Sequence, residues 1–398
     1  MPFYVKMGQV PAKRHVQYRR PDGGLYAEEV MGQEGFSGNQ SILYHHYPPT
    51  RVARFTKAYE RSIDPIGDEM LQMRHLRTTE IPPHGDPIDG RVELLFNNDV
   101  TISLSRPTDP MNYFYKNADG DDLVFIHEGT GRLETQFGHL NYREGDYLII
   151  PHGTIWRIIA DSNPQRHLWA ESRGKYEPPR RYRNEFGQFL EHSPYCERDI
   201  RTPEALETRT DTGDFEVRIH RRGKVFSYTY EHHPFDVVGW DGFVYPWAFN
   251  INDFEPITGR VHMPPPIHQT FQGPNFVVCS FCPRMLDYHP NAVPVPYNHS
   301  NVDSDEVLYY VNRKFGSRKG IEEGSITLHP SGLPHGPQPG AVEASLGKTH
   351  TEELAVMIDT FYPLHATKSA LEIEDPGYPT SWLGDPIKPP DGDTADTW

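Results

Sequence analysis

Short runs with strand character, separated by turns, dominate the chain from about residue 52 onward. Several of them alternate apolar and polar residues with a period of two, which is typical of half-buried β-strands. Asn-Asn, Asp-Gly and His-Gly pairs between the runs mark turns. The first group of runs consists of VELLFNND, TISLS, DLVFIHEG, RLETQFGHLNY, YLIIPHG and IWRII.

A second strand-rich region follows a connection rich in charges and prolines (165–210). Its runs are FEVRIHRRGKVFSYTYEHH, DVVGWDGFVYPWAFNI, NFVVCSFC, EVLYYVNRKF, SITLHPSG and ELAVMIDTFYPL. We therefore expect two β-rich halves with short flanking segments. The predicted boundaries are an extended N-terminal arm at 1–50, a first half at 51–190, a connection at 191–210, a second half at 211–371 and an acidic, Pro-rich tail at 372–398.

Composition supports an all-β protein with many turns. The 38 Pro and 33 Gly residues are scattered through the 398 positions, and Pro breaks long helices. A hydrophobic content of 36% is enough for real cores, and the length suits two domains or one duplicated fold.

Net charge and cysteine use limit the possible partners and compartments. The formal charge of −16 argues against nucleic acid or an anionic membrane surface as a partner. No apolar run approaches the ~18 residues of a membrane span, and the N-terminal stretch has no apolar leader segment. Three cysteines do not form a disulfide framework, so we expect a cytoplasmic protein.

An internal repeat relates the two halves. Aligning 115–127 with 299–311 places Asn117 on Asn301 and Asp122 on Glu306. Aligning 145–156 with 324–335 superimposes two glycines and a proline. This repeat predicts two copies of one β-fold.

The two copies differ at positions that carry chemistry. His299 aligns with Tyr115, and His335 aligns with Trp156. Because aromatic side chains fill an interior but do not bind a divalent metal, the first copy is expected to be structural. The site is expected in the second copy.

His299, Glu306 and His335 are the candidate metal ligands. Two neutral imidazoles and one carboxylate bind Fe(II) and leave one face of its octahedron open, whereas a structural zinc site is closed. Asp305 is an alternative carboxylate, and a barrel that has lost its metal is an alternative to the whole set.

The patterns H-x-N-x4-E and G-x5-P-x-G-x2-H resemble the two cupin motifs, with Asn301 where many cupins have a second His. The segments PDGGLYAEEVMGQEGFS, NADGDDLVFIHEG, FDVVGWDGFVYPWAFNI and NFVVCSFCPR through LPHGPQPG resemble the homogentisate 1,2-dioxygenase family more closely, in the same order, over most of 1–365. The resemblance implies an all-β, two-half cupin (double-stranded β-helix, or jelly roll) with a degenerate N-terminal copy. It also implies a single Fe(II) in the C-terminal copy and a homo-oligomer, either a trimer or a hexamer.

The resemblance also implies roles for residues around the metal. The family's iron ligands carry over to His299, Glu306 and His335, with a one-residue insertion that favours Glu306 over Asp305. A family active-site His matches His329, which would handle protons, and an active-site Tyr matches Tyr297, which would orient the ring.

Two departures from the family bear on the substrate. The family's W-H-G, whose His acts as a base, is Trp240-Asp241-Gly242 here, so Asp241 is expected to accept the proton. A family Tyr that hydrogen-bonds the substrate falls near Phe315. Asn301 and Arg313 are further candidates for contacts with the substrate, and Lys314 or Arg284 are alternatives to Arg313 as partners of its carboxylate.

These features predict an Fe(II)-dependent dioxygenase that opens the ring of a homogentisate-like hydroquinone or a related hydroxylated aromatic acid and inserts both atoms of O2. Its partners are then a small aromatic substrate and O2. The alternative is a non-oxidative, metal-dependent bicupin that is isomerase-like or binds a ligand.

Overall fold

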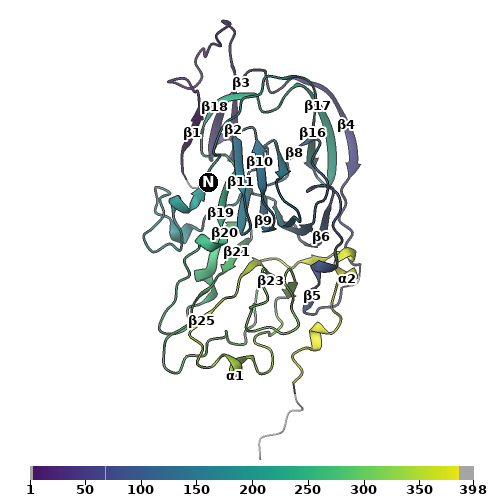
Figure 1. Cartoon of the computed structure of the whole chain (residues 1–398), viewed down its shortest axis with the longest axis vertical. Helices are drawn as coiled ribbons and strands as arrows, with labels where there is room; N and C mark the ends of the chain where they lie inside the picture. Colours follow the sequence, from purple (N-terminus) through teal and green to yellow (C-terminus); the bar gives the residue numbers. More distant parts are fainter. Residues whose placement is uncertain (1–2, 68, 385–398) are drawn as a thin grey trace, which may run out of the picture.

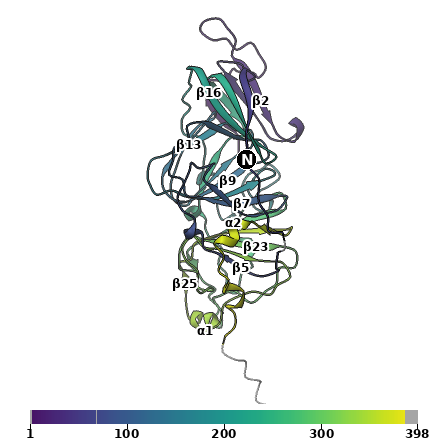
Figure 2. The ribbon, with the colours of Figure 1, turned by 90° about the vertical axis from the view of Figure 1, so that its right-hand side faces the viewer.

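Two β-rich halves lie one above the other along the long axis of the molecule (Figure 1; Figure 2). The computed structural model describes residues 3–67 and 69–384. Only two short α-helices occur among these residues, α1 (Ala341–Ser345) and α2 (Lys368–Glu372). The expected all-β, two-half cupin architecture is confirmed.

The first half is a jelly roll of two sheets whose strand pairs are antiparallel except for one parallel pair in the second sheet. The eight-stranded sheet has the order β15 (Ile200–Arg201), β19 (Trp247–Asn250), β12 (Asp146–Ile150), β9 (Asp122–Glu128), β14 (Arg166–Ser172), β7 (Val100–Ser105), β6 (Arg91–Phe96) and β27 (His365–Ala366). The seven-stranded sheet has the order β11 (Gly138–Tyr142), β10 (Gly131–Thr135), β13 (Trp156–Ala160), β8 (Phe114–Asn117), β16 (Thr212–Arg221), β17 (Lys224–His232) and β4 (Val52–Glu60).

The boundary expected at residue 211 does not separate the halves. The hairpin β16–β17 pairs with β8 and β4, and β19 pairs with β12, so residues 212–250 belong to the sheets of the first half. An alternating pattern predicts a strand but does not show which sheet the strand joins. The second half therefore begins at the short helical turn Pro265–His268.

The expected N-terminal arm is part of a sheet. Its strands β1 (Val5–Gly8), β2 (Ala27–Gly32) and β3 (Gln40–His45) join β18 (Val237–Gly242) in the order β1-β18-β3-β2. β3 is buried along most of its length because it lies between two strands. Pairing with β18 holds the strands of this segment on the rest of the chain, so the segment is not a free arm.

The second half is built on one six-stranded sheet. Its order is β20 (Gln269–Gly273), β21 (Phe276–Phe281), β26 (Ala355–Thr360), β23 (Asp305–Tyr310), β24 (Ile326–His329) and β5 (Arg74–Leu76). A short pair, β22 (Arg284–Met285) and β25 (His350–Thr351), lies beside it. β5 comes from the first half of the sequence and β27 returns to the first sheet, so each half holds a strand of the other.

One continuous apolar core crosses the junction between the halves. The ring of Tyr309 in β23 lies 6.3 Å from the ring of Phe125 in β9, and the rings of Tyr147 and Phe271 are 5.3 Å apart. The hydroxyl groups of Tyr147 and Ser280 are hydrogen-bonded at 2.9 Å across the same junction. The two halves are therefore packed as parts of one core.

Strand pairing reproduces the repeat expected from the sequence. Tyr115 pairs with Trp156 in the first half, and His299 pairs with His335 in the second. The cross-strand partners also correspond, because Asp122 pairs with Ile150 and Glu171 as Glu306 pairs with His329 and Asp359. Equivalent residues thus surround equivalent points in the two halves.

In the first half, an arginine side chain lies at the point that these paired residues surround. The guanidinium of Arg91 stacks over Trp169, 3.4 Å from the ring centroid, with Tyr115 on another side. Its Nη1 lies 3.8 Å from Asp122 Oδ1 and 3.7 Å from Glu171 Oε2, and the side chains of all three charged residues are almost fully buried. Arg91 is thereby the ion-pair partner of Asp122, and Glu171 also pairs with Arg173 at 2.6 Å and with Arg61 at 3.5 Å.

The segment after α2 is not the irregular surface tail that its composition predicts. Tyr378, in the short helical turn η7 (Tyr378–Thr380), is 3% exposed, and Trp382 donates its indole N–H to the carbonyl of Gly336 at 3.1 Å. Residues 385–398 of the predicted tail lie outside the described residues. Within 3–67 and 69–384, no helix has the length and apolar character needed to span a membrane.

Replacing Arg91 by Met should destabilise the fold by about 3–5 kcal/mol, because the substitution leaves the buried Asp122 without its ion-pair partner. Chemical denaturation of the metal-free protein measures this loss. Arg54→Met is the matched control, since Arg54 pairs with Asp214 on the surface and an exposed pair contributes at most about 1 kcal/mol. Equal losses in the two variants would contradict the assigned role of Arg91.

Candidate metal centre

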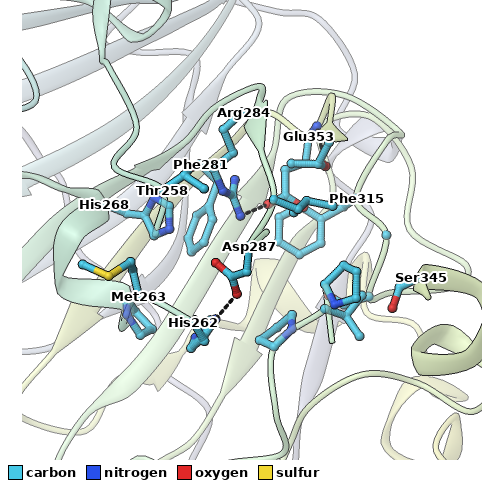
Figure 3. Close-up of a pocket in the computed structure, with 18 of the residues that line it drawn as sticks. Thr258, His262, Met263, His268, Phe281, Arg284, Asp287, Phe315, Ser345 and Glu353 are labelled. Atoms are coloured by element: carbon cyan, nitrogen blue, oxygen red, sulfur yellow. Dashed lines mark hydrogen bonds and ion pairs between the residues drawn. The ribbon is translucent and has the colours of Figure 1, made fainter. Parts of the chain in front are cut away.

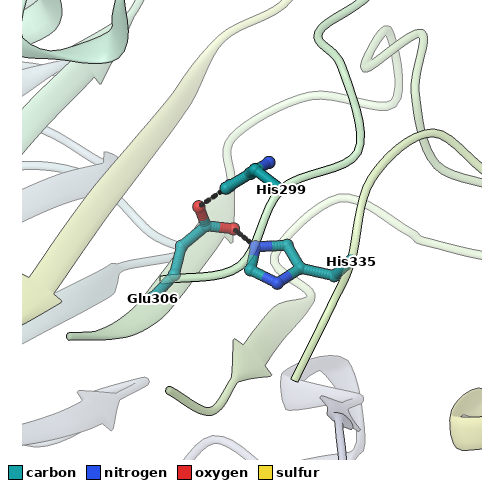
Figure 4. Close-up of side chains that lie close together, drawn as sticks. All are labelled: His299, Glu306 and His335. Carbon is teal, nitrogen blue, oxygen red and sulfur yellow. Dashed lines mark ion pairs between the residues drawn. The ribbon is translucent and has the colours of Figure 1, made fainter. Parts of the chain in front are cut away.

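Three side chains from separate segments converge at one end of the inner face of the second half (Figure 4). Glu306 is in β23, where Leu308 and Tyr310 share its side of the strand. His299 and His335 lie in loops and are joined by two reciprocal backbone hydrogen bonds, each of 2.8 Å. This backbone bridge fixes the distance between the two imidazoles before any ligand binds.

Hydrogen bonds to backbone carbonyls orient both imidazoles. Nδ1 of His335 lies 3.1 Å from the carbonyl oxygen of Leu333, and Nδ1 of His299 lies 3.3 Å from that of Tyr297. Because a carbonyl only accepts, each Nδ1 carries a hydrogen, and a neutral ring keeps its lone pair on Nε2. The Nε2 atoms of His335 and His299 lie 3.5 and 3.7 Å from the carboxylate oxygens of Glu306.

This arrangement fits a bound cation. Nε2 of His335 is buried without a hydrogen-bond partner among the described residues. The three ligand atoms all lie within 4.8 Å of one another. Two nitrogens and one oxygen on one side, with open positions on the other, form the donor set of non-haem Fe(II) sites.

Protons and a metal ion compete for this group of side chains. Burial works against ionisation of Glu306, but the hydrogen bond to His329 and the nearby imidazoles of His299 and His335 hold its pKa well below the usual range. The nearby carboxylate of Glu306 raises the pKa of His299 above its ordinary value. Below that pKa, a metal ion competes with a proton for His299.

Asp305, the alternative carboxylate, is already engaged by the backbone. One of its oxygens accepts the N–H of Ser331 and the other accepts the N–H of Leu364, both at 2.8 Å. It points to the opposite side of β23 from Glu306 because side chains alternate along a strand. The geometry therefore favours Glu306 over Asp305 as the candidate carboxylate ligand.

His329 lies behind Glu306 and is fully buried. Its Nδ1 is 2.7 Å from Glu306 Oε1, and its Nε2 is 3.0 Å from the hydroxyl of Tyr378. Burial lowers the pKa of His329 to about 4, so the ring is neutral at physiological pH. The structure places it in contact with the carboxylate ligand, outside the cavity that a substrate would enter.

A cavity of about 780 Å³ opens onto His299 and Glu306 (Figure 3). Tyr297 and Asn301 line it, as expected of substrate-contacting residues. Phe315 forms part of an apolar wall, with its ring 6.0 Å from that of Phe281 and 5.0 Å from that of Tyr310. This is the size and mixed lining of a small-molecule site.

Two expected site residues lie elsewhere. Asp241 is in β18, at the opposite end of the molecule from β23, and accepts a 2.6 Å hydrogen bond from the hydroxyl of Tyr4 (Figure 1). Within this chain it cannot serve the centre as a base. Arg313 is exposed and does not line the cavity, whereas Arg284 and Lys314 do.

His262 is a cavity residue that the sequence patterns did not indicate. Its Nδ1 lies 3.5 Å from Asp287 Oδ2, and its ring is 5.0 Å from that of Tyr297 (Figure 3). His262 and Asp287 lie on separate loops that carry no periodic pattern, so only the folded chain shows that they form a pair.

Asp359 is a second cavity residue that the patterns missed. It is the cross-strand neighbour of Glu306, and its Oδ1 is buried without a hydrogen-bond partner among the described residues. Burial and the charge of Glu306 raise the pKa of Asp359 well above its usual range. The sequence signal that could have indicated Asp359 is a single carboxylate inside the apolar run AVMIDT.

Another group of possible ligands, His127, Glu128 and Glu323, lies between the halves. Both nitrogens of His127 have partners, with the hydroxyl of Tyr309 at 2.5 Å and Glu323 Oε1 at 3.4 Å. Arg166 already pairs with Glu128 at 2.8 Å. Internal hydrogen bonds and an ion pair account for this group.

Comparison with known proteins agrees with this geometry. Residues 23–251 match the family described as "Homogentisate 1,2-dioxygenase N-terminal". A protein of Saccharolobus solfataricus that carries the provisional name of a dioxygenase is 41% identical over 96% of this chain and 99% of its own length. Homogentisate 1,2-dioxygenases of Bradyrhizobium diazoefficiens and Rhizobium etli are 29% and 26% identical, over 70% and 88% of this chain and 65% and 84% of their own lengths.

The affinity of the centre for a divalent ion should weaken as pH falls. The pKa of His299 is raised, so its proton competes with the metal below that pKa and is absent above it. Competition titrations with a chromophoric chelator across this range measure the dependence. A pH-independent affinity would contradict the assignment of His299 as a ligand.

Proposed function

Because this chain belongs to the homogentisate 1,2-dioxygenase family, we propose that it is an Fe(II)-dependent dioxygenase that opens the ring of a hydroxylated aromatic acid and inserts both atoms of O2. The observation that carries the proposal is the convergence of His299 Nε2, His335 Nε2 and the Glu306 carboxylate beside a cavity. Bound Fe(II) would supply open coordination positions for O2 and for the substrate's oxygens, together with redox capacity.

The cavity walls would orient the ring of the substrate. Phe281 and Phe315 form an apolar surface on which an aromatic ring can pack. Tyr297 lies beside the ligand His299, with ring centroids 6.0 Å apart. These contacts hold the ring next to the metal ligands and leave the polar substituents to other residues.

Basic side chains would receive the acid group of the substrate. Arg284 lines the cavity and pairs with Glu353 at 2.7 Å, while Arg318 lines it beside Tyr310 and Glu306. In a protein of net charge −16, such local cations are needed to bind an anionic substrate.

The pair of His262 and Asp287 would replace Asp241 as the group that accepts a proton from a substrate hydroxyl. The carboxylate of Asp287 stabilises the imidazolium that forms and directs the other ring nitrogen. Asp359 would offer a hydrogen-bonding group next to Glu306. The chain thus provides both a proton acceptor and a polar contact around the open face of the metal.

Anaerobic loading with Fe(II) should give O2 consumption that depends on a substituted hydroquinone, catechol or aminophenol. His335→Ala should abolish both the consumption and stoichiometric iron, because it removes one of three ligands. An oxygen electrode and metal analysis measure the two effects. Iron-replete protein that consumes no O2 with any of these aromatics would favour the non-oxidative bicupin instead.

His262→Asn should lower kcat by about 100-fold or more, a typical effect of losing a general base, while iron content stays unchanged. The matched control is His350→Asn, since His350 also lines the cavity but is exposed and lies away from the ligands in β25. Steady-state kinetics on both variants measure the difference. Equal rates in the two variants would remove His262 from the mechanism.

A further inference from the structure

The C-terminal segment carries a hydrogen-bond relay to the metal centre. We propose that Tyr378 is a positioning residue that fixes the ligand Glu306 through His329. The inference rests on the proposed metal centre, not on the ring-cleaving reaction. It gives a function to a segment whose sequence shows no motif.

The relay allows only one arrangement of hydrogens. Glu306 as a carboxylate can only accept, so His329 Nδ1, 2.7 Å away, must carry the hydrogen. Nε2 of the neutral ring then has a lone pair and accepts the hydroxyl hydrogen of Tyr378 at 3.0 Å. The phenol thereby fixes the tautomer of His329, and His329 fixes Glu306 Oε1.

Anchors on both sides hold Tyr378 in place. Before it, Glu374 pairs with Arg74 at 2.7 Å, and Asp375 pairs with Arg77 at 3.0 Å. Both arginines belong to or flank β5, the strand next to the one that carries His329. The position of the phenol is therefore set by the sheet that also carries the ligand.

After Tyr378 the chain contacts the loop that follows the last ligand. Gln338 donates to the hydroxyl of Ser381 at 2.6 Å, and Trp382 donates to the carbonyl of Gly336 at 3.1 Å. The ring of Trp382 also lies edge-on to His329, with centroids 6.2 Å apart. One short segment thus constrains the surroundings of both Glu306 and His335.

The first half provides an internal comparison. Ile150 occupies the position of His329, and it pairs with Asp122 as His329 pairs with Glu306. An isoleucine cannot relay a hydrogen bond, and this half balances its carboxylate with Arg91 instead. The relay therefore occurs in the half that has the metal-ligand set, as expected if it serves the ligands.

Tyr378→Phe tests the relay because it removes one hydroxyl and keeps the ring. Partners of this kind usually contribute 10–100-fold to metal affinity, so we expect Co(II) and Fe(II), measured anaerobically against a competing chelator, to bind about 10–100-fold more weakly. The Co(II) absorption spectrum should also change, because the orientation of the carboxylate changes. Tyr176→Phe is the matched control, since its buried hydroxyl bonds the carbonyl of Ala170.

A double-mutant cycle shows whether Tyr378 acts through His329. His329→Ile copies the residue of the first half, so the strand should tolerate it. In that background Tyr378→Phe should cause no further loss of metal affinity. Full additivity, or an unchanged affinity in Tyr378→Phe alone, overturns the proposal.

The outcomes separate this inference from the proposed function. If the wild type binds metal tightly but consumes no O2, the proposed dioxygenase activity is overturned. The proposed relay can then still be tested with Co(II). Wild-type protein that binds neither ion would overturn both. Equal weakening in Tyr378→Phe and Tyr176→Phe would show a general loss of stability and would overturn the relay.

Discussion

A buried pair of acidic side chains lies at the centre of each half. In the first half, the arginine Arg91 lies beside Asp122 and Glu171 and stacks on Trp169, while Arg173 and Arg61 also pair with Glu171. In the second half, the ion-pair partners of Glu306 among the described residues are all histidines. One fold therefore surrounds its buried acidic side chains in two ways, with guanidinium groups in one copy and with imidazoles in the other.

Shared strands and a common apolar core join these two halves. Each half holds a strand of the other, and the apolar core passes between them through Phe125 and Tyr309. The first half thus packs against β23, the strand that carries Glu306. The reciprocal backbone bonds between His299 and His335 complete the centre, so most of its geometry exists before a metal binds.

Patterns along the sequence were sufficient to find the duplication and the three residues that converge in the second half, because both depend on spacing within short segments. The structure adds that the aligned residues pair across strands within each half, Tyr115 with Trp156 and His299 with His335. The boundary predicted at residue 211 was wrong because the alternating pattern of β16 and β17 does not show which half they join. The pairing of β16 with β8 places both strands in the first half. His262 and Tyr378 were missed because their roles arise from contacts between distant loops, and Asp241 was assigned from local resemblance alone.

The central claim is that the chain has one metal centre, in its second half. Crystals of anaerobically iron-loaded protein, measured with anomalous diffraction at the iron edge, test it most directly. We predict one peak per chain, between His299, Glu306 and His335, and none beside Arg91. A peak at His127 and Glu323 alone, two peaks per chain, or no peak would contradict the account.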